Sequence, residues 1–249
     1  MAVLEHLKPQ RVFYYFEEIS KIPHGSGNTR QISDYLAAFA QKQGLKWIQD
    51  ESNNVVIFKE ASKGYENAPT VMLQGHMDMV CEKKAGSTHD FTRDPLELQV
   101  DGDFISAKGT TLGGDDGIAV AYGLALLEDN TLEHPALEVV FTVDEEIGLL
   151  GAAALDASCL KAKYLINLDS EEEGILWAGC AGGMTAVTKL PVRYQEGTGM
   201  KWEIQVSGLL GGHSGAEIDK NRANATVVLA RFLKECRQQG EYALAELSG

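Results

Sequence analysis

The sequence is poor in cysteine, and its cysteines form no pattern. Cys81, Cys159, Cys180 and Cys236 are scattered, without a Cys-x-x-Cys pair. This spacing disfavours both a thiolate zinc site and a disulfide framework. We therefore expect reduced, mostly buried thiols, with Cys81 near any site formed around His76.

The chain has no excess of positive charge, and it has no long apolar runs. Its 22 basic and 36 acidic residues give a net charge of -14. Nucleic-acid phosphates and anionic membrane surfaces would repel such a chain, so we expect neither as a partner. No apolar run is long enough to span a bilayer, and the N-terminal ten residues lack the apolar core of a signal peptide. A cytoplasmic protein that binds small molecules, peptides or cations is expected.

With 249 residues, 44% of them hydrophobic, the chain can form one large domain, or a domain plus part of another. Apolar residues at helical spacing predict helices over residues 7–22 and 28–44. Short strands are expected at 46–49 and 54–58, and a hairpin at 95–105.

The stretch Val71–Lys83 predicts a strand that breaks at Gly75 and is followed by His76 and Asp78. In an extended backbone residues i and i+2 point to the same side, so the imidazole and the carboxylate arrive together. That pair suits a metal ligand whose second ring nitrogen is held by an acid. A surface pair or a structural hydrogen-bonded pair is the alternative.

Residues 109–129 predict a glycine-rich loop and then a helix that is apolar nearly all round and therefore buried. Asp115 and Asp116 stand at its start. Acids at a helix N-terminus are stabilised by the exposed N–H groups, which is one explanation of the pair. It accounts less well for two carboxylates at a buried helix end, where charges are costly unless paired or bound to a cation.

Two more strands end in acids. A β-rich run finishes with Glu145 and Glu146, and an apolar strand finishes with Asp169. Ligands gather at the carboxyl ends of strands in α/β sheets, so one sheet would bring these acids to the same edge as His76. An acidic helix start is the alternative for the two glutamates, and residues 171–173 are interpreted as a solvated loop.

One imidazole with several carboxylates suits zinc, cobalt or manganese better than copper. If Asp115 bridges two ions, His76 and Asp169 can complete the first. Glu146 can serve the second, which is then one histidine short. Glu145 stays free to act as general base for a metal-bridging water.

The C-terminal part has a different pattern. Residues 184–192 and 202–206 alternate like half-exposed strands, and 221–238 predict a helix with an inward apolar face. Between them the glycine-rich stretch 207–215 presents His213, for which an ordinary turn histidine is the alternative.

Five ordered motifs resemble one known family. They are GHMDMV at 75–80, TTLGGDDGIA at 110–119, DEEIGLLGA at 144–152, NLDSEEEG at 167–174 and GGHSGAEIDKNRANA at 211–225. Over essentially the whole chain they resemble the co-catalytic zinc exopeptidases, and most of all the bacterial aminoacyl-histidine dipeptidases (Xaa-His or cytosol non-specific dipeptidases).

This resemblance implies an α/β fold with an incomplete mixed-sheet zinc-exopeptidase catalytic domain at residues 1–183. Part of an α+β lid and dimerisation domain would follow at residues 184–249. The reaction implied is hydrolysis of unblocked dipeptides, including those with C-terminal histidine. The lid domain would also allow homodimers.

The resemblance assigns metal ligands. His76, Asp115 and Asp169 would hold one zinc ion, and Asp115 with Glu146 would hold the second. These assignments follow from the positions of the motifs.

It also assigns supporting roles. Asp78 would orient His76, and the peptide bond after Asp115 would be cis. Glu145 would be the base that takes a proton from the attacking water and returns it to the leaving amine. His213, on the lid, would help to stabilise the oxyanion, in some relatives at the partner subunit's site.

The sequence departs from the family at one ligand. The family's last histidine lies far downstream, whereas no histidine follows His213. We therefore expect a fragment or a truncated product with exposed strand edges and low stability. Two other hypotheses stay open, namely an amidohydrolase of the same superfamily that acts on N-acyl amino acids or tripeptides, and a non-catalytic metal-binding chain.

Overall fold

The computed structural model describes residues 2–170, 172–180, 182, 184, 186–212 and 217–248. The chain divides into two units, Met1–Ile175 and Leu176–Gly249. The boundary of the lid domain between residues 183 and 184 stays a prediction. Among the described residues, no helix combines the length and the apolar character needed to cross a bilayer.

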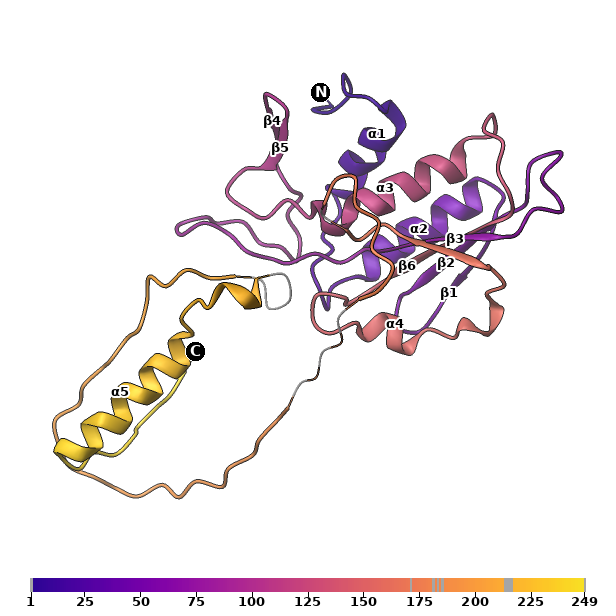
Figure 1. The fold of residues 1–249 in the computed structure, drawn as a ribbon. Coiled ribbons are helices and arrows are strands. Elements are labelled where there is room, and N and C mark those ends of the chain that lie inside the picture. Colours follow the sequence, from indigo (N-terminus) through magenta and orange to yellow (C-terminus); the bar gives the residue numbers. More distant parts are fainter. Residues whose placement is uncertain are drawn as a thin grey trace. The chain divides into compact units, whose positions relative to one another are not determined.

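The first unit is built around a five-stranded mixed sheet with the order β1-β2-β6-β3-β7 (Figure 1). Its strands are β1 Lys46–Gln49, β2 Val55–Lys59, β3 Val71–His76, β6 Leu137–Thr142 and β7 Tyr164–Asn167. β2 is antiparallel to β1 and β6, whereas β3 runs parallel to both β6 and β7. The last residues of these three parallel strands therefore lie at one edge.

Helices cover both faces of this sheet. They are α1 Gln10–Ile19, α2 Arg30–Lys42, α3 Gly114–Glu128 and α4 Leu150–Ala154. The first three lie over one face, and α4 lies on the other (Figure 1). The predicted helices and strands of this unit are confirmed with shifted ends. The predicted break at Gly75 is wrong, because β3 continues through Gly75 to His76. The predicted hairpin forms as β4 Leu98–Asp101 and β5 Phe104–Ala107.

The core lies between the helices and the sheet. Val12, Phe16 and Ile19 of α1 are buried in it together with Val139 and Phe141 of β6. The helix α3 is apolar nearly all round because it is enclosed by α1 on one side and by the sheet on the other. Its approach to β6 is close, since a Cβ at Gly123 would lie 2.7 Å from Phe141 Cζ and 2.9 Å from Val139 Cγ1.

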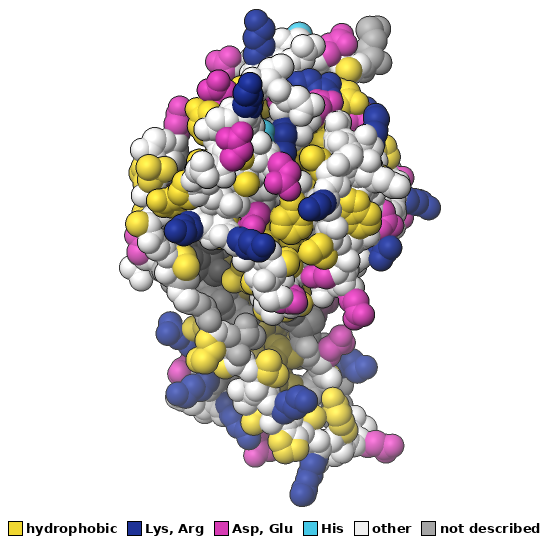
Figure 2. Space-filling view, turned by 90° about the vertical axis from the view of Figure 1, so that its right-hand side faces the viewer, with side chains coloured by type: hydrophobic (Ala, Val, Ile, Leu, Met, Phe, Trp, Pro, Cys, Tyr) yellow, Lys and Arg dark blue, Asp and Glu magenta, His cyan; other side chains and the backbone are white. Residues whose placement is uncertain are grey.

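The strand β7 is an edge strand with exposed apolar side chains. Tyr164, Leu165 and Ile166 are 61%, 60% and 48% exposed, so neither face of this strand is covered. On the face shown in Figure 2, hydrophobic, acidic and basic side chains are interspersed.

The second unit contains the helix α5 Ala225–Gln239, which begins where the Asn224 side chain accepts a hydrogen bond from Val227 N–H. The predicted helix is thus confirmed, but its predicted inward face is wrong, because Val228 and Phe232 are exposed. The strands predicted at 184–192 and 202–206 are also wrong for the described residues there. A strand needs a hydrogen-bonded neighbour, and the described part of this unit supplies none.

The cysteine prediction is half right. All four thiols are free, as expected. The expected burial is wrong, because Cys81 and Cys180 are exposed and Cys159 and Cys236 are half-buried. Cys81 lies on the loop after β3 and Cys180 lies in the second unit, where the described chain is mostly uncovered.

Substitution of Gly123 tests the close approach of α3 to β6. Gly123→Ala should lower the free energy of unfolding by about 1–3 kcal/mol, because the added methyl group would overlap two side chains of β6. Urea denaturation measures this change. Gly114→Ala is the matched control in the same helix, since its Cβ would meet only Leu112 Cδ2 at 3.6 Å. Equal stability of the two variants would contradict the packing argument.

Candidate metal centre

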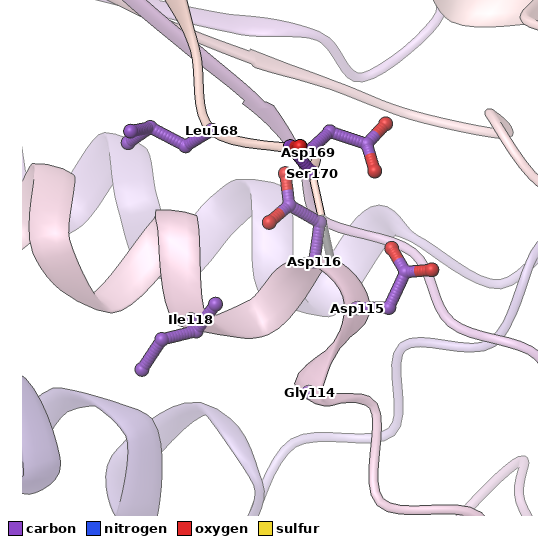
Figure 3. Close-up of a pocket in the computed structure, with 7 residues that line it drawn as sticks. All are labelled: Gly114, Asp115, Asp116, Ile118, Leu168, Asp169 and Ser170. Atoms are coloured by element: carbon purple, nitrogen blue, oxygen red, sulfur yellow. The ribbon is translucent and has the colours of Figure 1, made fainter. Parts of the chain in front are cut away.

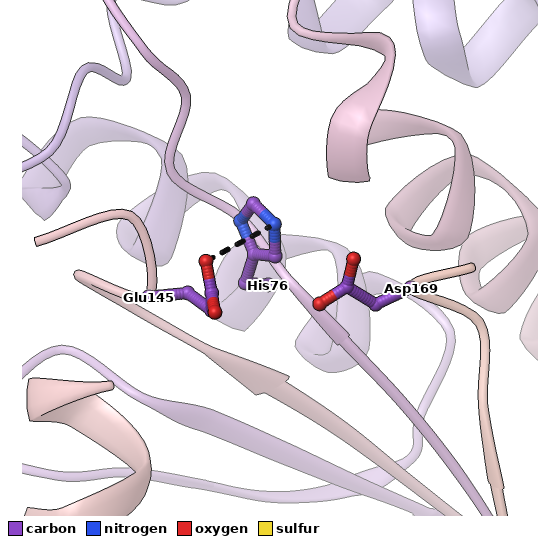
Figure 4. Close-up of side chains that lie close together, drawn as sticks. All are labelled: His76, Glu145 and Asp169. Carbon is purple, nitrogen blue, oxygen red and sulfur yellow. Dashed lines mark ion pairs between the residues drawn. The ribbon is translucent and has the colours of Figure 1, made fainter. Parts of the chain in front are cut away.

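The predicted donors meet at the carboxyl ends of the three parallel strands. His76 is the last residue of β3, Glu145 and Glu146 follow β6, and Asp169 follows β7. Single donor atoms of His76, Glu145 and Asp169 lie within 4.8 Å of one another. Figure 4 shows the two carboxylates on either side of the imidazole.

A second group of donors shares the same histidine. Donor atoms of His76, Asp115 and Glu146 also lie within 4.8 Å of one another. The Nε2 atom of His76 is 2.9 Å from Asp115 Oδ1 and 3.9 Å from Glu145 Oε2. This grouping differs from the predicted one, which joins Asp169 to Asp115 rather than to Glu145. The division of the donors between two ions stays a prediction.

The ring of His76 is held by its other nitrogen. Nδ1 donates to the main-chain oxygen of Asp78 at 2.9 Å, and the Asp78 carboxylate oxygen Oδ1 is 3.4 Å away. With its hydrogen on Nδ1, the ring presents Nε2 to the acidic cluster. The main chain at residue 78 thus helps to orient His76, a role predicted for the Asp78 carboxylate alone.

Asp78 connects the end of β3 to two other segments. Its carboxylate accepts hydrogen bonds from the Ser26 hydroxyl at 2.8 Å and from Glu145 N–H at 3.1 Å. Burial acts against the charged form, but hydrogen bonds from His76, Ser26 and Glu145 outweigh it and lower the pKa of Asp78. Asp78 therefore stays ionised and joins the strand end to the loop that carries Glu145. Ser26 had no predicted role, and no motif pointed to it.

The start of α3 directs two carboxylates to different sides. Asp115 and Asp116 have non-helical backbone angles, and the peptide bond between them is cis, as the resemblance implied. In Figure 3 Asp115 and Asp169 extend to the same side, whereas Asp116 points the other way. Asp116 is 2% exposed, and its Oδ2 accepts a hydrogen bond from His76 N–H at 3.2 Å. The sequence placed Asp116 at the helix start but indicated no separate role for it.

The cluster is short of positive charge. Burial, with added repulsion from Asp169 and Asp115, raises the pKa of Asp116 to about 7. Burial and nearby carboxylates also raise the pKa values of Glu145 and Glu146. Burial disfavours the charged imidazole, yet the acids around it raise the pKa of His76 to about 11. A divalent cation would relieve the repulsion among these acids, so the donor set fits a metal ion.

An open cavity of about 200 Å³ gives access to these donors (Figure 3). It is lined by Gly114, Asp115, Asp116, Ile118, Leu168, Asp169 and Ser170. A ligand can thus reach the carboxylates of Asp115 and Asp169. His213, the remaining predicted site residue, lies outside the described residues.

Comparison with known proteins points to one family. The sequence profile of peptidase family M20/M25/M40 matches residues 72–245. The chain is 40% identical over its whole length to the cytosol non-specific dipeptidase of Escherichia coli (strain K12), of which it covers 52%.

Two solved structures resemble the fold. An aminoacylhistidine dipeptidase from Vibrio alginolyticus matches with a TM-score of 0.72 and 37% identity, over 92% of this chain and 47% of that one. A tripeptidase from Staphylococcus aureus matches with a TM-score of 0.56 and 26% identity, over 67% of this chain and 44% of that one. The chain thus spans about half the length of the relatives that it matches.

Substitution of Gly75 tests how the contact between β3 and α3 contributes to this centre. A Cβ at Gly75 would lie 2.5 Å from Asp116 Oδ2 and 2.5 Å from Ala119 Cβ. Gly75→Ala should therefore push the start of α3 away from β3 and separate Asp115 from His76. We expect zinc affinity to fall about 10- to 100-fold, measured by competition with a chromogenic chelator. Unchanged zinc affinity in the folded variant would refute this role of the contact.

Proposed function

The chain belongs to peptidase family M20/M25/M40, and from this premise we propose that it carries the metal centre of a dipeptidase. The family match confirms the resemblance predicted from the five motifs. One observation supports this activity. His76 lies close to the acids that follow β6 and β7 and to Asp115 at the start of α3.

We propose two zinc ions at this centre, which cobalt or manganese could replace. His76, Asp115 and Asp169 would hold one ion, and Asp115 with Glu146 the other. The short contact between His76 Nε2 and Asp115 Oδ1 supports the assignment of these two residues to the same ion. When bound, the ions would polarise the substrate carbonyl and lower the pKa of an attacking water.

Glu145 is the proposed general base. Its carboxylate is near His76 Nε2, and its main-chain N–H is held by Asp78. Burial raises its pKa, which favours proton transfer near neutral pH. Glu145 would take a proton from the attacking water and return it to the leaving amine. Asp78 is the proposed positioning residue for His76, and His213 is the proposed oxyanion donor.

The proposed substrates are unblocked dipeptides, including those that end in histidine. The names of the relatives from E. coli and V. alginolyticus support this class. We also propose a cytoplasmic location, supported by the name of the E. coli relative, and a homodimer formed through the lid domain.

An amidohydrolase or tripeptidase activity is the second candidate. The similarity to the S. aureus tripeptidase favours it, because the same ligands can serve a longer substrate. A non-catalytic metal-binding chain is the third, since the second ion has no histidine among the assigned ligands.

The proposal predicts zinc-dependent hydrolysis by the complete natural protein. Isothermal titration should detect two zinc ions per chain, and Gly-His and β-alanyl-histidine should be cleaved. Removal of the metal with a chelator should abolish turnover, and added zinc should restore it. Faster cleavage of tripeptides would favour the second candidate. One weakly bound ion without turnover would support the non-catalytic one.

Substitution of Glu145 tests its proposed role as general base. Glu145→Gln should lower kcat by about 10²- to 10⁴-fold, because the amide cannot accept the proton. Zinc content should stay at the wild-type level, since this residue is not a proposed ligand. Metal analysis and steady-state kinetics test both statements, with Glu66→Gln as an exposed control on a distant loop. Loss of zinc in the variant would instead identify Glu145 as a ligand.

A further inference from the structure

A buried side chain from another segment closes the base of the loop that carries Glu145 and Glu146. Asn54, just before β2, is 1% exposed. Its Oδ1 accepts a hydrogen bond from Val143 N–H at 3.1 Å, and its Nδ2 donates to the Gly151 main-chain oxygen at 2.9 Å. One amide group thus joins the two ends of the loop.

The orientation of this amide is itself determined. Asp50 Oδ2 accepts from Asn54 Nδ2 at 2.7 Å, and Asp50 Oδ1 accepts from Asn54 main-chain N–H at 2.8 Å. Both hydrogens of Nδ2 therefore have acceptors, and Oδ1 is left to face Val143 N–H. This buried point needs one acceptor and two donors. An amide supplies all three, whereas an ionised carboxylate supplies no donor.

The amide acts where main-chain pairing stops. The register of β2 and β6 ends at the pair Val55 and Phe141, beyond which β6 continues only to Thr142. The side chain of Asn54 bonds the next N–H group of that chain, at Val143. It thereby sets the point at which the chain leaves the sheet and enters the loop.

The other end of the loop fits only glycine. Gly151 N–H donates to the Val143 main-chain oxygen at 3.0 Å. A Cβ at Gly151 would lie 2.3 Å from that oxygen and 2.6 Å from Asn54 Oδ1. The two ends of the loop are therefore in direct main-chain contact beneath the amide of Asn54.

The middle of the loop has two further attachments. Asp144 Oδ1 accepts a hydrogen bond from Gly27 N–H at 2.7 Å, and Glu145 N–H donates to Asp78 at 3.1 Å. Each of these is a single hydrogen bond to a different segment. Other main-chain hydrogen bonds, such as that from Leu150 N–H to the Asp144 oxygen at 3.1 Å, lie within the loop and shape it. With a loose base, the two bonds to Gly27 and Asp78 would have to fix both glutamates relative to the sheet.

We propose that Asn54 is a positioning residue for Glu145 and Glu146. It acts by fixing the base of their loop to β2 and has no contact with the reacting atoms. The inference rests on the function proposed above for the two glutamates. The side chains at the loop tip must be held within a fraction of an ångström for proton transfer and metal binding, so a loose base would reduce both.

Two variants of the complete natural protein test this role. Asn54→Leu removes both side-chain hydrogen bonds to the loop, and the one to Asp50, at similar side-chain size. Asn54→Asp keeps the shape and the acceptor for Val143 N–H but loses the donors to Gly151 and Asp50 and sets an oxygen against both acceptors. This variant decides the matter if the leucine variant does not fold. We expect kcat and zinc affinity to fall about 10- to 100-fold with KM little changed.

Hydrogen exchange of the metal-free protein gives a readout independent of activity. Amides of residues 143–151 should exchange faster in both variants, whereas those of β3 and of β6 up to Phe141 should keep their wild-type rates. Ser62→Ala is the matched control. The Ser62 hydroxyl bridges the N–H and the oxygen of His134 outside this loop, at 2.8 Å and 3.1 Å, so this variant should keep kcat and the loop exchange rates.

Two results would overturn the inference. One is unchanged exchange in the loop. The other is faster exchange with wild-type kcat and zinc affinity, which would make Asn54 a structural residue only. A wild-type protein that neither binds zinc nor cleaves dipeptides would refute the proposed function instead, and the exchange rates alone would then decide whether Asn54 holds the loop.

Discussion

The close approach of α3 to the end of β3 is the constraint on which the centre depends. Gly75 has no side chain, and this lets the helix start reach the strand. Asp116 can then accept a hydrogen bond from the main chain of His76, while Asp115 reaches its ring. Two neighbouring residues at the start of α3 thus contact the last residue of β3, one at its main chain and the other at its ring. The acidic loop after β6 and the end of β7 add their donors around this junction.

Charge explains why the junction suits a metal ion. Carboxylates gathered at one sheet edge repel one another, and burial makes their charges more costly. Asp78 stays ionised because hydrogen-bond donors surround it, but the pKa values of Asp116, Glu145 and Glu146 are raised. A divalent cation would supply the missing positive charge. Metal binding should therefore stabilise the folded state of this edge.

Much of the centre could be predicted from residues close in the sequence. His76 and Asp169 each follow an apolar strand, and Asp115 follows a glycine-rich loop at a helix start. Roles that depend on distant segments could not be predicted. The bond from Ser26 to Asp78 spans 52 residues, and the bond from Asn54 to Gly151 spans 97. No periodicity reports such pairs, because they depend on where whole elements pack.

The sequence by itself determined the element types and the donor chemistry, because side-chain periodicity and turn residues act over a few neighbouring positions. It also determined which strand ends carry acids, since each acid directly follows its apolar run. Only the tertiary structure decided how these donors group around His76 and how the loop of Glu145 is held. The physical reason is that strand order and crossover connections bring distant residues together, and hydrogen bonds between them form only once those elements have packed.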